Sequence, residues 1–199
     1  MTEKKKKGWR REIIEWGIFL GVIGILFFTG LHTEVIGGMQ RLILKIGLIT
    51  PNVEQREAAY PLADYNFTIT SVENNESVSF VEFKDKVVFL NFWATWCPPC
   101  IAEMPNIQSL YENVDHDDIV FVMLSVDDEL QKARDFIDKK GFTFPTYHLK
   151  NPIPSVFSSE SIPTTFVISP KGEVVLKKSG MAQYDNEKFR QFLKELADG

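Results

Sequence analysis

The chain is poor in cysteine and histidine, with two cysteines and three histidines among its 199 residues. A disulfide-stapled scaffold needs more cysteines at wider spacing than the single pair Cys97 and Cys100. A tetrahedral zinc site needs four ligands, and the histidines form no His-x3–5-His pair that would complete one. These are His32, His116 and His148. The sequence therefore argues against a disulfide framework and against structural zinc, and we expect no metal and no cofactor.

An excess of positive charge is also missing. Lysine and arginine total 22 against 27 aspartates and glutamates, a formal net charge of −5. Nucleic-acid binding needs a basic face, so we expect no nucleic-acid partner. The first residues are nevertheless basic, with positive charges at Lys4, Lys5, Lys6, Lys7, Arg10 and Arg11. The chain is 44% hydrophobic with 16 Phe, which is enough for one domain with a full core and an appendage.

Charged residues are absent from residues 16–31, WGIFLGVIGILFFTGL. Counted from Ile13, the apolar stretch would cover ~28 Å as a helix, close to the ~30 Å hydrocarbon core of a bilayer. The alternative is a cleaved signal peptide, for which residues 35–37 offer only a poor cleavage site. We therefore expect a retained transmembrane signal anchor at residues 13–32.

The basic residues before this stretch predict the topology. Positively charged segments stay on the cytoplasmic side, so residues 1–12 would form a cytoplasmic tail. The protein would then cross the cytoplasmic membrane once, with the rest of the chain extracytoplasmic, or periplasmic if an outer membrane exists. Protein disulfides form and need correcting in exported compartments.

Residues 33–60 would connect the anchor to a soluble domain. Apolar residues at 35, 36, 39, 42, 43 and 46 predict an amphipathic helix within 34–49. This helix would lie on the membrane surface or pack on the soluble domain, and the pattern favours neither. Pro51 would end it, and residues 51–60 have the composition of a polar linker.

Residues 61–199 carry the pattern of an α/β domain with a sheet of mixed direction. Two alternating runs predict a β-hairpin over 65–83, and the Pro170-Lys171-Gly172 turn between 164–169 and 173–179 predicts another. The almost wholly apolar runs 87–93 and 119–127 are typical of strands covered on both faces. Helices are predicted after the cysteine pair to about Asn113, over 130–141 with Gly141 as its stop, and over 186–197.

The cysteine pair lies where a buried strand runs into a helix. Cys97 would fall at the helix N-terminus, where backbone N–H groups and the helix dipole favour a negative sulfur. Cys100 would lie one turn further on, close enough to form a disulfide with Cys97. Pro98 and Pro99 suit the first helical positions, where their missing N–H groups would have no intrahelical partner. This arrangement indicates a redox-active disulfide with Cys97 as the nucleophile.

The run Phe92-Trp93-Ala94-Thr95-Trp96-Cys97-Pro98-Pro99-Cys100 resembles the active site of the thioredoxin superfamily. Its continuation to Pro105 is similar to the TlpA/ResA branch of anchored, extracytoplasmic thiol–disulfide oxidoreductases. Ile162-Pro163-Thr164-Thr165-Phe166 resembles the cis-proline loop that faces the cysteines in that family. The resemblance implies a thioredoxin-like fold with an N-terminal β-hairpin and an extra strand and helix at about 119–141.

The resemblance also implies roles for single residues. Thioredoxin has a buried aspartate at the position of Asn91, but the Asn91 side chain cannot accept a proton. The TlpA/ResA branch uses instead a glutamate, at the position of Glu103. Glu103 would exchange a proton with Cys100, although its place in the first turn also suits a solvated residue that complements the dipole. Pro163 would be cis. The substrate groove is expected to involve Trp96, Pro98, Pro99, Ile162 and Thr164, while Trp93 would be core and His116 and His148 solvated.

Two other functions are open to a chain with this pair. A peroxiredoxin-type peroxidase has a Pro-x-x-x-Thr/Ser-x-x-Cys pattern, but positions 90 and 94 here are Leu and Ala. A copper or haem chaperone is the second, although copper chaperones of this fold use CxxxC with a downstream histidine. We therefore expect a reductase of disulfides in exported proteins such as apocytochrome c. A membrane electron-relay protein would return the cysteines to the dithiol form.

Overall fold

The computed structural model describes residues 9, 11–21, 49–53, 61–114, 117–150 and 152–199. The chain divides into two compact units, Met1–Met39 and Gln40–Gly199. In the first unit, residues 11–21 are helical with exposed side chains. Within the described ranges, no helix combines the length and the apolar character needed to cross a membrane. Most of the expected anchor, amphipathic segment and linker lies outside the described residues.

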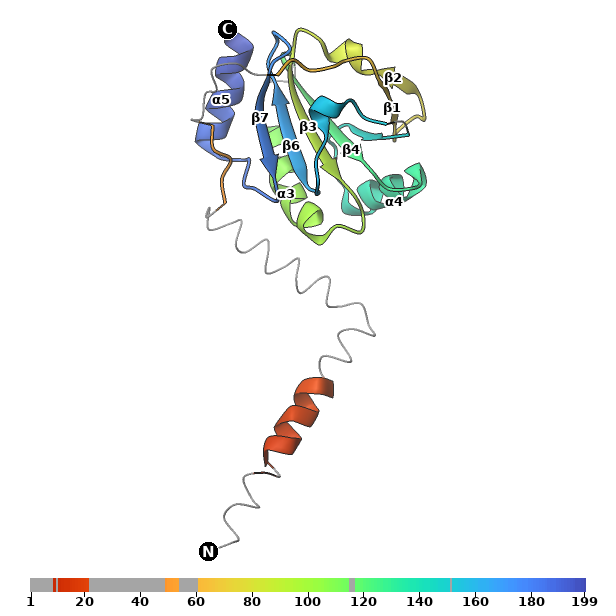
Figure 1. The fold of residues 1–199 in the computed structure, drawn as a ribbon, viewed down its shortest axis with the longest axis vertical. Coiled ribbons are helices and arrows are strands. Elements are labelled where there is room, and N and C mark those ends of the chain that lie inside the picture. Colours follow the sequence, from red (N-terminus) through yellow and green to blue (C-terminus); the bar gives the residue numbers. More distant parts are fainter. Residues whose placement is uncertain (1–8, 10, 22–48, 54–60, 115–116, 151) are drawn as a thin grey trace, which may run out of the picture. The chain divides into compact units, whose positions relative to one another are not determined.

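The second unit is built on one seven-stranded mixed sheet with the order β2-β1-β5-β4-β3-β6-β7 (Figure 1). The central strand β3 pairs in parallel with β4 and antiparallel with β6. The strands are β1 (Thr68–Ser71), β2 (Ser77–Ser79), β3 (Val87–Trp93), β4 (Ile119–Ser125), β5 (Thr146–His148), β6 (Thr164–Ile168) and β7 (Val174–Ser179). The predicted α/β domain with a mixed sheet is confirmed.

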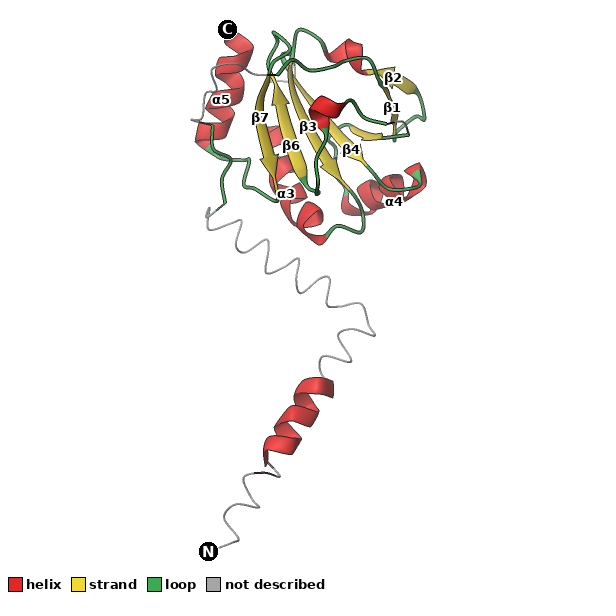
Figure 2. Ribbon diagram, viewed as in Figure 1, coloured by secondary structure: helices red, strands yellow, loops and turns green. Residues whose placement is uncertain are grey.

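Among the described residues of this unit there are also three α-helices and two short 3-10 helices (Figure 2). They are α3 (Pro98–Glu112), α4 (Leu130–Lys140), α5 (Glu187–Asp198), η1 (Phe80–Phe83) and η2 (Ser155–Phe157). The helix α4 ends as predicted, because Gly141 adopts the left-handed conformation with φ 70° and its N–H donates to the Ile137 carbonyl. All three α-helices were predicted from their sequence patterns.

Strand β3 is buried along its whole length, as its apolar run predicts. Side chains alternate between the two faces of a strand, so β3 contributes to two cores. Val87, Phe89 and Trp93 pack with residues of α3, α4 and α5. The intervening residues pack in a second core, which includes aromatic residues of η1 and η2. Asn91 has the same parity as Phe89 and Trp93, and therefore lies on the face that the helices cover.

Three expectations need correction. The second strand of the first hairpin ends at Ser79 instead of continuing to residue 83, because the next residues form η1 and bury Phe80 and Phe83 in the second core. Strand β4 ends at Ser125, two residues before the predicted end. Strand β5 was not predicted, since three residues are too few for an alternating pattern, and its place depends on pairing with β1 and β4.

Candidate functional site

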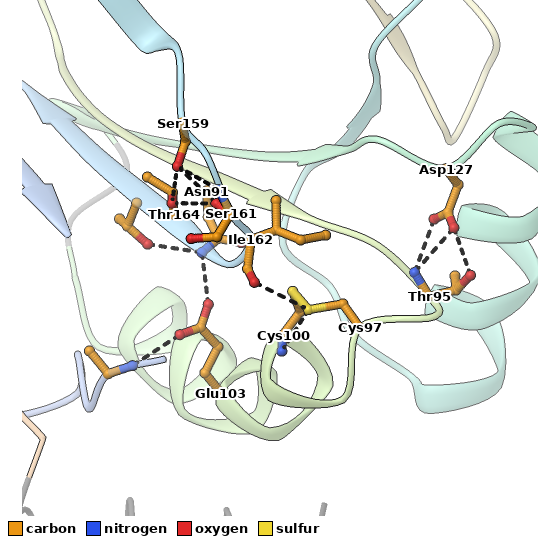
Figure 3. The surroundings of a disulfide bond; sticks show 12 residues. Asn91, Thr95, Cys97, Cys100, Glu103, Asp127, Ser159, Ser161, Ile162 and Thr164 are labelled. Carbon is orange, nitrogen blue, oxygen red and sulfur yellow. Dashed lines mark hydrogen bonds between the residues drawn. A yellow bond between two sulfur atoms is a disulfide. The ribbon is translucent and has the colours of Figure 1, made fainter. Parts of the chain in front are cut away.

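The cysteine pair occupies the N-terminus of α3, as the sequence predicts (Figure 3). Cys97 is the N-cap residue, Pro98 and Pro99 are the first two helical residues, and Cys100 follows. The two sulfurs form a disulfide of 2.08 Å, and the Cys100 N–H donates to Cys97 Sγ at 3.3 Å. Cys97 is 4% exposed and Cys100 is fully buried, so Cys97 is the more accessible of the two residues. The preceding Trp96 is 66% exposed beside it.

The loop before β6 faces this disulfide. The Ile162–Pro163 peptide bond is cis, as the sequence resemblance predicts. The carbonyl oxygen of Ile162 lies 3.8 Å from Cys97 Sγ. Thr164, another predicted residue of the substrate groove, has a buried side chain whose hydroxyl donates to the Ser161 carbonyl at 2.8 Å. Its side chain therefore stabilises the loop, while partly exposed Ile162 lies beside the cysteines.

Glu103 lies one helical turn after Cys100 and is fully buried. Its Oε1 accepts a hydrogen bond from Asn91 Nδ2 at 2.9 Å, and its Oε2 accepts one from the Ala182 N–H at 3.1 Å. The alternative of a solvated first-turn glutamate is therefore wrong. Burial raises the pKa of Glu103 from 4.5 to about 8, although the Asn91 and Ala182 hydrogen bonds and the charge of Lys178 oppose the rise.

Comparison with known proteins identifies the family of the chain. Residues 64–177 match the AhpC/TSA family. The chain is 30% identical to the thiol-disulfide oxidoreductase ResA of Oceanobacillus iheyensis over 176 residues, which cover 87% of this chain and 83% of that protein. It is also 31% identical to the sporulation thiol-disulfide oxidoreductase A of Bacillus subtilis over 144 residues, 69% of this chain and 86% of that one.

The chain belongs to the AhpC/TSA family, as a thiol–disulfide oxidoreductase of the ResA type. Solved structures agree with this assignment and with the thioredoxin-like fold. StoA of Bacillus subtilis is 29% identical with a TM-score of 0.54, covering 63% of this chain and 94% of that one. A thiol:disulfide interchange protein of the thioredoxin family from Chlorobium tepidum is 25% identical with a TM-score of 0.59, covering 71% and 99%.

The loop that leads from β3 to the ResA-type pair is held by a second set of hydrogen bonds, in which Asp127 and Ser125 are buried. The Asp127 carboxylate follows β4 and accepts hydrogen bonds from the Thr95 N–H, at 3.1 and 3.2 Å, and from the Thr95 hydroxyl, at 2.7 Å. The Ser125 hydroxyl donates to the same carboxylate at 2.8 Å. Parallel strands end at the same edge of a sheet, so Asp127 meets the segment that leads from β3 to Cys97.

Sequence reasoning missed this network, and it misplaced His148. The ring of His148 was expected to be solvated, but β5 buries it, and its Nε2 lies 2.7 Å from the Asp127 carbonyl oxygen. The available signal was an aspartate at the end of the apolar run 119–127. His116 lies outside the described residues. Trp93 is buried in the core as predicted.

In this oxidoreductase, a chain of hydrogen bonds continues from Glu103 to the neighbouring strand β6. Asn91 Nδ2 donates to Thr165 Oγ1 at 2.9 Å as well as to Glu103. Tyr184, from the segment after β7, donates its hydroxyl to the same Thr165 oxygen at 2.7 Å. Asn91 and Thr165 are partners in the β3–β6 register, which brings residues far apart in sequence into contact.

In the part of the chain that the structure describes, no group of three or more His, Cys, Asp and Glu side chains is arranged to hold a metal.

Proposed function

We propose that this oxidoreductase is a protein-disulfide reductase that acts on exported proteins, with apocytochrome c as a candidate substrate. One observation carries the proposal: a buried carboxyl group, Glu103, lies one turn beyond Cys100 with its pKa raised to about 8. An ordinary thiol has a pKa of about 8.5. A carboxyl group and a thiol of similar pKa exchange a proton readily, which disulfide reduction by a dithiol requires.

The first step forms a mixed disulfide. The Cys97 thiolate attacks one sulfur of the substrate disulfide, so that a Cys97–substrate bond forms and the second substrate sulfur leaves as a thiolate, which water protonates. The helix N-terminus stabilises the attacking thiolate, and the exposed Trp96 and the Ile162 carbonyl flank it.

The second step releases the substrate. Glu103, as a carboxylate, accepts the proton of the Cys100 thiol, and the Cys100 thiolate attacks Cys97 Sγ. The Cys97–Cys100 disulfide forms, and the remaining substrate sulfur leaves as a thiolate. The substrate gains two electrons in all and the cysteine pair loses two. A membrane electron-relay protein with its own dithiol would return the pair to the reduced form.

We also propose a location for each part of the chain. We place residues 1–12 in the cytoplasm and residues 13–32 in the cytoplasmic membrane, with residues 33–60 as connection and 61–199 as the extracytoplasmic domain. The basic residues before Trp16 and the uncharged run after it support this topology. The substrates would then be disulfide-containing proteins that have been exported.

Trapping in cells tests the proposed mechanism. A Cys100→Ser variant completes the first step but cannot resolve it, so it should accumulate mixed disulfides on non-reducing gels after acid quenching and alkylation. The matched Cys97→Ser variant lacks the attacking sulfur and should accumulate none. Mixed disulfides only in Cys97→Ser would reverse the assigned roles. If Cys100→Ser captures no exported proteins, the proposed substrate class is wrong.

A further inference from the structure

The Asn91 side chain holds one of two possible amide orientations, and the observed one leaves a buried oxygen without a partner. Its Nδ2 group donates one hydrogen to Glu103 (Figure 3). It donates the other to Thr165. Within the described residues, its Oδ1 is buried without a hydrogen-bond partner. An unpaired buried acceptor costs stability, so other contacts must hold the amide in this orientation.

Thr165 supplies such a contact through its hydroxyl oxygen. A hydroxyl has one hydrogen to donate and two lone pairs to accept with. Thr165 Oγ1 accepts from Asn91 Nδ2 on one side and from the Tyr184 hydroxyl on the other. With both lone pairs occupied, the Thr165 hydrogen points away from Asn91. If the Tyr184 hydroxyl were absent, Thr165 would be free to rotate and to donate to Asn91 Oδ1 instead.

A rotated amide would change what Glu103 meets. It would turn Oδ1 toward the carboxyl group, and an oxygen acceptor disfavours a carboxylate while it accepts from a protonated carboxyl. The observed orientation does the opposite, because an N–H donor favours the carboxylate. The hydrogen-bond direction set at Tyr184 is therefore passed through Thr165 and Asn91 to Glu103.

We propose that Tyr184 is a positioning residue for Glu103, which holds the Asn91 amide with its NH2 group toward the carboxyl group and so favours the carboxylate form. The catalytic meaning of this arrangement rests on the proposed role of Glu103 in proton transfer with Cys100. Tyr184 itself touches neither cysteine nor substrate in this account. It determines how easily Glu103 releases its proton.

The other ionisable groups around Glu103 do not change their charge between the variants below. Lys178 on β7 favours the carboxylate by its charge. Cys97 and Cys100 on α3 do not titrate while they form the disulfide. Tyr184 stays neutral, because burial and the nearby Glu103 raise its pKa well above 10.0. A shift in the Glu103 titration between variants therefore reports the hydrogen-bond chain.

The test measures the pKa of Glu103 in the oxidised full chain, in detergent and without substrate. The infrared band of the protonated carboxyl group, assigned by its loss in Glu103→Gln, is followed against pH. Tyr184→Phe should shift the Glu103 titration upward by on the order of one pH unit, the effect of weakening one hydrogen bond to the charged form. Circular dichroism establishes that each variant is folded.

Tyr65→Phe is the matched control. It deletes the same atom from another buried tyrosine, whose hydroxyl has no hydrogen-bond partner among the described residues and which packs in the second core. Its Glu103 titration should equal that of the unchanged chain. No shift or a downward shift in Tyr184→Phe, or an equal shift in Tyr65→Phe, overturns the proposal.

Substitutions at Thr165 test the route. Thr165→Val should shift the titration upward as Tyr184→Phe does, and the double variant should add nothing, because both changes break one chain. Thr165→Ser retains the hydroxyl and should restore the original titration. Additive shifts, or a Thr165→Ser protein that titrates like Thr165→Val, overturn the proposal. Failure of the proposed function would give a different result. In that case Glu103→Gln would reduce substrate at the same rate and with the same pH profile as the unchanged protein, whatever the infrared titration shows.

Discussion

Glu103 shows how one buried side chain links the site to stability. Its pKa is 4.5 in an ordinary setting and about 8 in the folded protein. Below pH 4.5 the carboxyl group is protonated in both states, and the fold keeps the full contribution of this group. Between these values the unfolded chain releases the proton while the folded protein retains it, so stability falls as the pH rises toward 8. At about 1.4 kcal/mol per pH unit, the loss amounts to several kcal/mol.

Glu103→Gln should remove this dependence, since an amide does not titrate. We expect the free energy of unfolding of the oxidised protein to fall between pH 5 and pH 8, and to fall much less in the variant. Urea unfolding at several pH values, followed by tryptophan fluorescence, measures both slopes. Glu112→Gln, an exposed residue on the same helix, serves as the control and should keep the original slope. Parallel curves for Glu103→Gln and the unchanged protein would contradict the prediction.

At the scale of the element, the N-terminus of α3 is poor in donors to the nucleophilic sulfur. Pro98 and Pro99 have no N–H group, and the hydrogen bond recorded for Cys97 Sγ comes from the Cys100 N–H. Strong oxidants of this fold stabilise the thiolate of the reduced form, which raises the potential to about −120 mV against about −270 mV for thioredoxin. A helix terminus with few N–H donors stabilises the thiolate less, so the disulfide form is favoured. The reduced protein is then a better electron donor, and the protein acts as a reductant.

We therefore expect a potential below roughly −200 mV, measured by equilibration of the purified protein against glutathione and then dithiothreitol. Pro99→His should raise it by tens of millivolts, because a charge-assisted hydrogen bond contributes ~1.5–3 kcal/mol and ~1.4 kcal/mol corresponds to 30 mV. Pro99→Ala restores the backbone N–H alone and separates its effect from that of the imidazole. A midpoint near −120 mV for the unchanged protein would mean that it inserts disulfides.

At the scale of the whole molecule, the function depends on the side of the membrane at which the pair works. The basic residues before Trp16 predict a cytoplasmic N-terminus and an extracytoplasmic cysteine pair. Alkaline phosphatase fused after Gly199 should therefore be active, since it needs an exported location to form its disulfides. A fusion that lacks residues 1–33 is the control and should be inactive. An active cytoplasmic reporter at Gly199 would contradict the topology.

The sequence by itself determined the local parts of this protein. Apolar runs marked β3 and β4, because buried strands need continuous hydrophobic side chains, and a hairpin pattern around a turn marked β6 and β7. Gly141 marked the end of α4, and the strand-to-helix junction placed Cys97 at the helix N-terminus. Each of these depends on neighbours within a few residues, which the order of amino acids contains directly.

Only the tertiary structure decided the surroundings of the cysteines. The burial of Glu103 depends on Asn91 and on Ala182, which is 79 residues away, and the hydrogen bond that fixes Asn91 joins it to Thr165, 74 residues away. The Asp127–Thr95 contact and the burial of His148 likewise depend on strands that the sheet places side by side. The pKa of a group follows its solvent access and hydrogen bonds, and these are set by which strands and helices pack together.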